Sequence, residues 1–319
     1  MFLFASCSVS PKYIVNEGLV FGTYYRIVYE SGKDYHMQIK ELLSNFNSSM
    51  STFDSLSLIS RINKNDTSVR VNDYFVHLMD VGNRITEETN GAFDMTVAPL
   101  VNAWGFGFEN RAAISQSLID SLCLLVGMNN ILVEGDKIIK KKEDCMLDAS
   151  AIAKGYGVDI VADFLSDKGV FNYLVEIGGE ISCSGVNSRN DHWRIGIDAP
   201  IEDSLAEHRE IQLIVQLSGQ ALATSGNYRN YYIQGDKKYA HTIDPRTGYP
   251  VDHSLLSASI IGSTCMEADA YATACMVLGL EDSKDLISNL PNVEACFIYN
   301  TDEGDRVYLT DGFSSFVVE

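Results

Sequence analysis

Two hydrophobic periodicities alternate along the chain. In one set of segments apolar and polar residues alternate with a period of two, which indicates strands, and between them apolar residues recur at helical spacing. Strands are expected at 24–29, 131–133, 174–177, 193–197, 211–217 and 257–261. Helices are expected near 35–50, 72–90, 115–126, 151–167, 264–279 and 281–289. Because few strands alternate tightly with helices, the pattern predicts an α+β fold with largely antiparallel sheets and packed helices.

The chain is long and apolar enough for one large core. It has 319 residues, of which 46% are hydrophobic, and no linker-like stretch or fixed-period repeat divides it. We therefore expect residues 17–319 to form a single domain, with residues 1–16 as an N-terminal tether. The formal net charge is −19, from 43 acidic and 24 basic residues. Nucleic acid would be repelled by this charge and is excluded as a partner.

A turn stands out at Asp244-Pro245-Arg246-Thr247-Gly248. Proline presets φ at the second turn position, and glycine adopts a later conformation that other residues resist. The turn follows an alternating stretch, so His241 is expected near the end of a strand.

A helix start is indicated downstream of this turn. Thr264 and Glu267 have the spacing of a capping box, and the helix they begin would put Asp269 and Thr273 one turn apart on one face. A carboxylate and a hydroxyl are the oxygen ligands that a hard cation such as Mg²⁺ prefers. The alternative is that Asp269 complements the helix N-terminus and Thr273 bonds back to a carbonyl.

Four further segments carry chemistry that core packing does not require. Residues 91–107 combine an acid, a threonine, glycines and aromatics, which suggests binding of a flat ring. Residues 148–159 put small residues and a lysine where a helix begins, a place suited to a phosphate. Residues 175–181 are expected to be a strand broken by paired glycines, which often marks close approach of a ligand or another strand. Residues 223–229 precede the His241 strand.

Taken in order, these motifs resemble the ApbE family of FAD:protein FMN transferases. The resemblance rests on Gly-Thr-Tyr at 22–24, Met-Ser-Thr-Phe at 50–53, the 91–105 segment, Ile-Ala-Lys-Gly-Tyr at 152–156, Gly-Gly at 178–179, Thr-Ser-Gly-x-Tyr-Arg at 224–229, His-x-Ile-Asp-Pro-Arg-Thr-Gly at 241–248 and Ala-Asp-x-x-Ala-Thr at 268–273. Two departures are visible: Met95 where the family often has proline, and Ala149-Ser150 where it often has leucine and glycine. Neither removes a side chain assigned to chemistry, so they bear on fine specificity.

The resemblance implies a magnesium site and an FAD site. Asp269, Thr273 and the backbone carbonyl of Ala151 would ligate Mg²⁺, which would bridge the pyrophosphate of FAD. Lys154 would lie near the phosphates or the flavin. The remaining implied contacts are Thr52 and Phe53 in the flavin pocket, Asp94 as a hydrogen-bond partner of the cofactor, and the strand end with Ile243 at the border of the nucleotide. Arg246 would either meet a phosphate or pair with an acid.

The implied reaction is transfer of FMN to a protein. A target threonine or serine hydroxyl attacks the FMN-side phosphorus, and AMP leaves; such a step needs charge stabilisation and positioning more than covalent catalysis. His241 is the leading candidate base because the unperturbed pKa of histidine is about 6.5, and Asp244 would orient it or act itself. Alternatively, His241 is a strand histidine that caps the turn.

Two other activities would use the same fold. A Mg²⁺-dependent FAD pyrophosphatase would give FMN and AMP with water in place of the hydroxyl. A non-catalytic FAD-binding lipoprotein would release no AMP, but binding alone does not require Asp269, Thr273 and His241.

Cys7 suggests where the protein works. Phe4-Ala5-Ser6-Cys7 resembles the lipobox of bacterial lipoproteins, with polar residues after it; only six residues precede Cys7, fewer than a signal segment needs, so the natural start is expected upstream. We expect a lipid anchor at Cys7 on the periplasmic side of a bacterial membrane, the alternative being a plain frayed N-terminus.

The acceptor would be a membrane electron-transfer subunit with an Asp-Gly-x-Thr segment. Asp311-Gly-Phe-Ser314 faintly resembles that segment, so self-modification at Ser314 is a hypothesis beside an ordinary turn.

Overall fold

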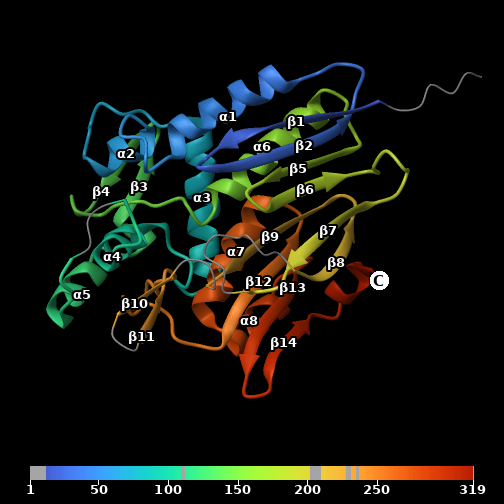
Figure 1. The fold of residues 1–319 in the computed structure, drawn as a ribbon. Helices are drawn as coiled ribbons and strands as arrows, with labels where there is room; N and C mark the ends of the chain where they lie inside the picture. Colours follow the sequence, from blue (N-terminus) through green and yellow to red (C-terminus); the bar gives the residue numbers. More distant parts are fainter. Residues whose placement is uncertain (1–11, 109–111, 202–209, 228–230, 235–236, 319) are drawn as a thin grey trace, which may run out of the picture.

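The computed structural model describes residues 12–108, 112–201, 210–227, 231–234 and 237–318 (Figure 1). An eight-stranded sheet in the order β1-β2-β5-β6-β9-β12-β13-β14 forms the centre, and its neighbouring strands pair antiparallel. Its strands are β1 Tyr13–Val20, β2 Thr23–Glu30, β5 Tyr173–Ile177, β6 Glu180–Ser184, β9 Gln220–Gly226, β12 Leu255–Gly262, β13 Glu294–Thr301 and β14 Gly304–Leu309. The prediction of an α+β fold with largely antiparallel sheets is confirmed.

Helices cover one face of this sheet. Helices α6 and α7 pack against it and against each other, and α1 and α3 lie beside them (Figure 1). Because α7 is the central helix, it is apolar on nearly every side, with Ala270, Cys275 and Met276 all buried. The helices are α1 His36–Met50, α2 Leu58–Asn63, α3 Asp73–Glu88, α4 Ala98–Trp104, α5 Gln116–Cys123, α6 Ala153–Asp167, α7 Cys265–Leu278 and α8 Leu280–Ser288.

A second, three-stranded sheet covers part of the opposite face. It has the order β15-β8-β7, and its Trp193 and Val215 pack on Ile181 and Leu222 of the central sheet. Its strands are β7 Trp193–Asp198, β8 Ile211–Leu217 and β15 Val317–Val318, and two separate hairpins are β3 Ile131–Glu134 with β4 Lys137–Lys140 and β10 Tyr231–Gln234 with β11 Lys237–Ala240. The middle strands of the central sheet are thus buried on both faces, and the site lies where strands of this sheet end.

The periodicity located six helices and six strands but missed other elements, among them the eight-residue strands β1 and β13. All the expected helices and strands are present, and Thr264 caps α7 as predicted, its hydroxyl accepting from the N–H of Glu267 at 3.4 Å. Helices α2 and α4 were not predicted, because six or seven residues are too few to show a helical period.

Two boundaries are corrected. The expected broken strand at 175–181 is instead a hairpin of β5 and β6, and Gly178 and Gly179 form its turn with φ of +66° and +104°, which favour glycine. Residues 13–16, assigned to the tether, belong to β1, so the boundary at residue 16 was wrong. Cys7 lies outside the described residues. Within the described part of the chain, no helix has the length and apolarity needed to cross a membrane.

Candidate active site

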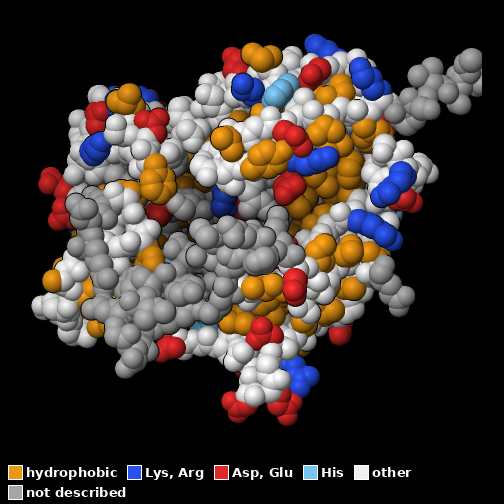
Figure 2. Space-filling model, viewed as in Figure 1, with side chains coloured by type: hydrophobic (Ala, Val, Ile, Leu, Met, Phe, Trp, Pro, Cys, Tyr) orange, Lys and Arg blue, Asp and Glu red, His pale blue; other side chains and the backbone are white. Residues whose placement is uncertain are grey.

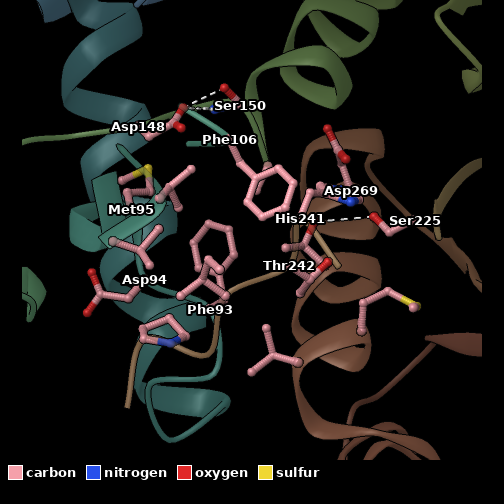
Figure 3. Close-up of a pocket in the computed structure, with 18 of the residues that line it drawn as sticks. Phe93, Asp94, Met95, Phe106, Asp148, Ser150, Ser225, His241, Thr242 and Asp269 are labelled. Atoms are coloured by element: carbon pink, nitrogen blue, oxygen red, sulfur yellow. Dashed lines mark hydrogen bonds between the residues drawn. The ribbon is translucent and has the colours of Figure 1, made fainter. Parts of the chain in front are cut away.

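A cavity of about 490 Å³ opens where strand ends of the central sheet meet α4, α6 and α7 (Figure 3). Segments that are far apart in the sequence converge on it: the loop before α4, the start of α6, the β5–β6 turn, the end of β9, the strand end at His241 and one face of α7. Its lining includes Phe53, Phe93, Asp94, Met95, Phe106, Asp148, Ser150, Ala151, Lys154, Gly178, Glu180, Ser225, His241, Thr242, Ile243, Asp269, Thr273 and Met276.

A buried charge cluster lies at one end of this cavity. The Nζ of Lys154 is 2.5 Å from Oε1 of Glu180 and 3.7 Å from Oδ1 of Asp269. The two carboxylate side chains are 4% and 3% exposed, so solvent screens their charges little. Burial opposes the charge on Lys154, but Asp269 and Glu180 outweigh it and raise the pKa of Lys154. For Glu180 the effects are reversed: burial raises the pKa of its carboxyl, and the Lys154 ammonium opposes that shift.

The three predicted metal ligands all line the cavity. Asp269 and Thr273 lie one turn apart on α7, as the spacing predicted, and Ala151 lies just before α6. The backbone N–H of Gly155 donates to Oδ2 of Asp269 at 3.0 Å, and the Thr273 hydroxyl is 3.3 Å from that of Ser225. Asp269 therefore fixes the start of α6 on α7 besides facing the cavity.

The donor set suits a hard cation. Two buried carboxylates share one ammonium, and Oε2 of Glu180 is buried without a hydrogen-bond partner among the described residues. A buried negative charge in excess of its partners is costly unless a further cation or proton compensates it. Carboxylate, hydroxyl and carbonyl oxygens are the ligands that Mg²⁺ prefers. In the described part of the chain, no three side chains of His, Cys, Asp or Glu gather as a metal site.

Aromatic and acidic side chains line the middle of the cavity. Phe93 and Phe106 lie there with Asp94 close by (Figure 3). Oδ1 of Asp94 accepts from the N–H and the hydroxyl of Thr96 at 2.7 and 2.5 Å, and burial raises the pKa of Asp94. The segment 91–107 thus brings aromatic rings and an acid together, as expected from its composition.

The strand end divides its residues between the cavity and the turn. His241 and Ile243 line the cavity, and the His241 ring packs edge-on against Phe106 with centroids 6.4 Å apart. Asp244 and Arg246 lie outside the lining. Both carboxylate oxygens of Asp244 accept from the Arg246 guanidinium at 2.9 Å. Of the two roles expected for Arg246, the contacts favour pairing with an acid. They do not support Asp244 as the residue that orients His241.

A second cavity of about 720 Å³ adjoins the first. Phe21, the end of α1 and residues 51–54 line it, including Thr52. Phe53, Ser150 and Lys154 line both cavities, so the two spaces meet at Lys154. Of the two residues predicted to contact the flavin, Thr52 lines the second cavity only, and Phe53 lies between the two cavities.

A family model described as "ApbE family" matches residues 21–297. The chain belongs to the ApbE family. A Vibrio cholerae serotype O1 protein named FAD:protein FMN transferase is 35% identical over 99% of this chain and 96% of its own length. A Haemophilus influenzae protein of the same name is 34% identical over 98% of this chain and 93% of its own length.

Solved ApbE structures have the same fold. The flavin transferase ApbE from Vibrio cholerae superimposes with a TM-score of 0.84 and 34% identity, over 96% of this chain and 99% of that one. The apo flavinyl transferase ApbE from Pseudomonas stutzeri gives 0.85 and 32%, over 99% and 98%. The likeness spans the entire ApbE domain.

Sequence reasoning gave no role to two residues of this ApbE site, Glu180 and Ser225. Glu180 directly follows the paired glycines. A carboxylate at the start of a strand, just after a tight turn, was the sequence feature that could have identified it as a site residue. Ser225 lies within the Thr-Ser-Gly motif, whose Tyr228 and Arg229 lie outside the described residues. Each side chain contacts a site residue on another element, Glu180 with Lys154 and Ser225 with Thr273. A pattern within one segment of sequence does not show such contacts.

Proposed function

We propose that this ApbE-family transferase moves FMN from FAD to a threonine or serine hydroxyl of an acceptor protein and releases AMP, with Mg²⁺ bound at the site. The relatives named FAD:protein FMN transferase support the overall activity. The observation that carries the finer proposal is that two cavities meet at Lys154, next to the buried carboxylates of Asp269 and Glu180.

The two cavities suit the two halves of FAD. The adenosine half would occupy the cavity of about 490 Å³, where Phe93 and Phe106 offer apolar faces and Asp94 a hydrogen-bond acceptor. The flavin would occupy the cavity of about 720 Å³ beside Thr52 and Phe53. The pyrophosphate would then lie at the junction, within reach of the Lys154 ammonium.

Asp269, Thr273 and the carbonyl of Ala151 would hold Mg²⁺ at that junction. When bound, Mg²⁺ supplies positive charge that stabilises the negative charge developing on the phosphate oxygens. Glu180 keeps the Lys154 ammonium at the same end of the cavity. The chain itself thus contributes positioning and one fixed cation.

The reaction is a displacement at the FMN-side phosphorus. The acceptor oxygen forms a bond to the FMN-side phosphorus, the bond from that phosphorus to the bridging oxygen breaks, and AMP leaves with the bridging oxygen. His241 takes the hydroxyl proton in our proposal, because it is the imidazole in the cavity lining. Arg246 holds Asp244 in the turn instead of acting on substrate.

We also propose that the enzyme is lipid-anchored through Cys7 on the periplasmic side of a bacterial membrane. The lipobox-like Phe4-Ala5-Ser6-Cys7 supports this, and a membrane electron-transfer subunit with an Asp-Gly-x-Thr segment would be the acceptor. Expression of the full natural chain and of its Cys7→Ala variant, followed by membrane fractionation, tests the anchor. Equal amounts of both proteins in the membrane fraction would contradict it.

The activity is tested by mixing the protein with FAD, Mg²⁺ and a small domain that carries an Asp-Gly-x-Thr segment. We expect AMP release together with covalent flavin fluorescence of the acceptor on a denaturing gel. AMP without a labelled acceptor would favour a pyrophosphatase, and tightly bound FAD without AMP would favour a carrier. Intact-mass analysis of the enzyme after the same incubation tests Ser314, for which an unmodified mass excludes self-modification.

A further inference from the structure

Lys154 is shared unequally between two buried carboxylates. Its Nζ lies 2.5 Å from Oε1 of Glu180 but 3.7 Å from Oδ1 of Asp269. The ammonium is thus in hydrogen-bond contact with Glu180, whereas Asp269, the anionic residue of the proposed metal set, has one oxygen that is only loosely paired.

We propose that Glu180 is a positioning residue that draws the Lys154 ammonium away from Asp269 and so keeps the Asp269 carboxylate open to a divalent cation. The inference deepens the proposed function and rests on it. It assigns to Glu180 a role that acts through Lys154, with no contact to the cation required.

The architecture leaves Asp269 with one oxygen facing the cluster. The other oxygen, Oδ2, accepts from the backbone N–H of Gly155 at 3.0 Å. No side chain can replace that glycine without collision, because a Cβ there would lie 2.2 Å from the carbonyl oxygen of Cys265. Gly155 is next to Lys154 in the chain, so the contact that fixes Asp269 also brings the Lys154 side chain beside it.

Glu180 is held where it competes for this ammonium. It is the first residue of β6, and the two-residue Gly178-Gly179 turn pairs it with Ile177 of β5. Its side chain is 4% exposed, and its Oε2 has no hydrogen-bond partner within the described ranges. Lys154 is therefore the cation on which the Glu180 carboxylate depends.

The Lys154 ammonium and a divalent cation would compete for the Asp269 carboxylate. An ammonium in contact with a carboxylate cancels much of the attraction of that carboxylate for a divalent cation. If Glu180 lost its charge, Asp269 would be the buried carboxylate left beside Lys154, and the ammonium would move toward it. Cation affinity should then fall although no ligand has been removed.

The test is a double-mutant cycle in Mn²⁺ affinity, measured without FAD from the electron paramagnetic resonance signal of free Mn²⁺. We expect Glu180→Gln to weaken Mn²⁺ binding by about tenfold, the low end of what changes beside a metal ligand cost. Lys154→Met in the Glu180→Gln background should restore the affinity to within a few-fold of the original. Glu180→Asp, which keeps the carboxylate, should bind more tightly than Glu180→Gln.

Any other outcome of this experiment contradicts a specific part of the proposal. If the double variant binds as weakly as Glu180→Gln, Glu180 is itself a ligand or a purely structural residue, and the positioning role is wrong. Equal affinity of Glu180→Gln and the original protein also rejects that role. Asp269→Asn serves as the reference: if it binds Mn²⁺ as tightly as the original protein, the metal assignment of the proposed function fails instead. Circular dichroism melts confirm that the variants compared are folded.

Discussion

The backbone N–H of Gly155 donates a hydrogen bond to the carboxylate of Asp269 across 3.0 Å. A residue at the start of α6 thereby holds the proposed metal ligand of α7 in place. The same glycine lets the two helices approach so closely that a Cβ would lie 2.2 Å from the carbonyl oxygen of Cys265 and 2.9 Å from the Cβ of Asp269. Gly155 therefore sets both the packing of α6 on α7 and the position of the Asp269 carboxylate.

Gly155→Ala should destabilise the protein. Alanine in place of a helical glycine gains about 1 kcal/mol of helix propensity, but overpacking typically costs about 1 to 3 kcal/mol, and here the obstacle is a backbone carbonyl that cannot change rotamer. We expect a net loss of up to about 2 kcal/mol in the free energy of unfolding, measured by urea titration.

Gly32→Ala is the matched control for that substitution. A Cβ at Gly32 would meet nothing within 4 Å, so its effect should stay within about 0.5 kcal/mol. If Gly155→Ala is as stable as Gly32→Ala, the close α6–α7 contact is not a constraint on the fold.

Gly155 also illustrates what sequence could and could not predict. The run of small residues before and within α6 suggested a phosphate cradle, but at this position the small residue is needed because α7 lies against it. In contrast, the capping threonine at 264 and the spacing of Asp269 and Thr273 are local features of one helix, and the structure agrees with both. Periodicity and capping are readable because they depend on neighbours in sequence.

The residues that sequence misjudged depend on partners far along the chain or on a choice between partners. Glu180 acquires its significance from Lys154, which lies on another element. Arg246 had two possible partners, and the structure favours Asp244 because both lie in one tight turn. The paired glycines were predicted to break a strand, but the pairing of β5 with β6 makes them the turn of a hairpin.

Asp269→Asn should abolish most turnover and leave the fold intact. Asparagine can still accept the hydrogen bond from Gly155, but it removes the anionic ligand, and charge stabilisation by a metal is worth several kcal/mol. AMP release should fall by about a hundredfold or more, at an unchanged urea midpoint. Glu281→Gln, which changes a carboxylate 78% exposed on α8, is the control and should retain full activity. Normal turnover of Asp269→Asn with Mg²⁺ would rule out the assigned ligand.

Phe53→Ala should weaken FAD binding without affecting stability. The Phe53 side chain is 79% exposed and lines both cavities, so it contributes little to the core and is placed to contact the flavin. We expect FAD affinity to fall by up to about tenfold, the equivalent of an aromatic contact of roughly 0.5 to 1.5 kcal/mol. Leu56→Ala is the comparison, since Leu56 is 81% exposed in the same loop but lines neither cavity. Equal FAD affinity of the two variants in a fluorescence titration would remove Phe53 from the flavin site.

Asp159 should make stability depend on pH. Its carboxylate accepts from the backbone N–H groups of Cys265 and Met266 at 2.8 Å, at the start of α7. Burial raises the pKa of Asp159 to about 7, although these two N–H groups oppose the shift. The folded protein therefore binds a proton that the unfolded chain releases, so stability from this group is present at low pH and is lost as the pH rises from about 4 to about 7.

Asp159→Asn removes this titration. The free energy of unfolding of the variant, relative to the original protein, should therefore rise between pH 5 and pH 8, as measured by urea titration at about four pH values. Asp167→Asn, an exposed change at the end of α6, should follow the original protein throughout. A difference between Asp159→Asn and the original protein that stays constant across this range would mean that Asp159 is ionised throughout. Its carboxylate would then be a charged cap of α7, stabilised by the two N–H groups and the helix dipole.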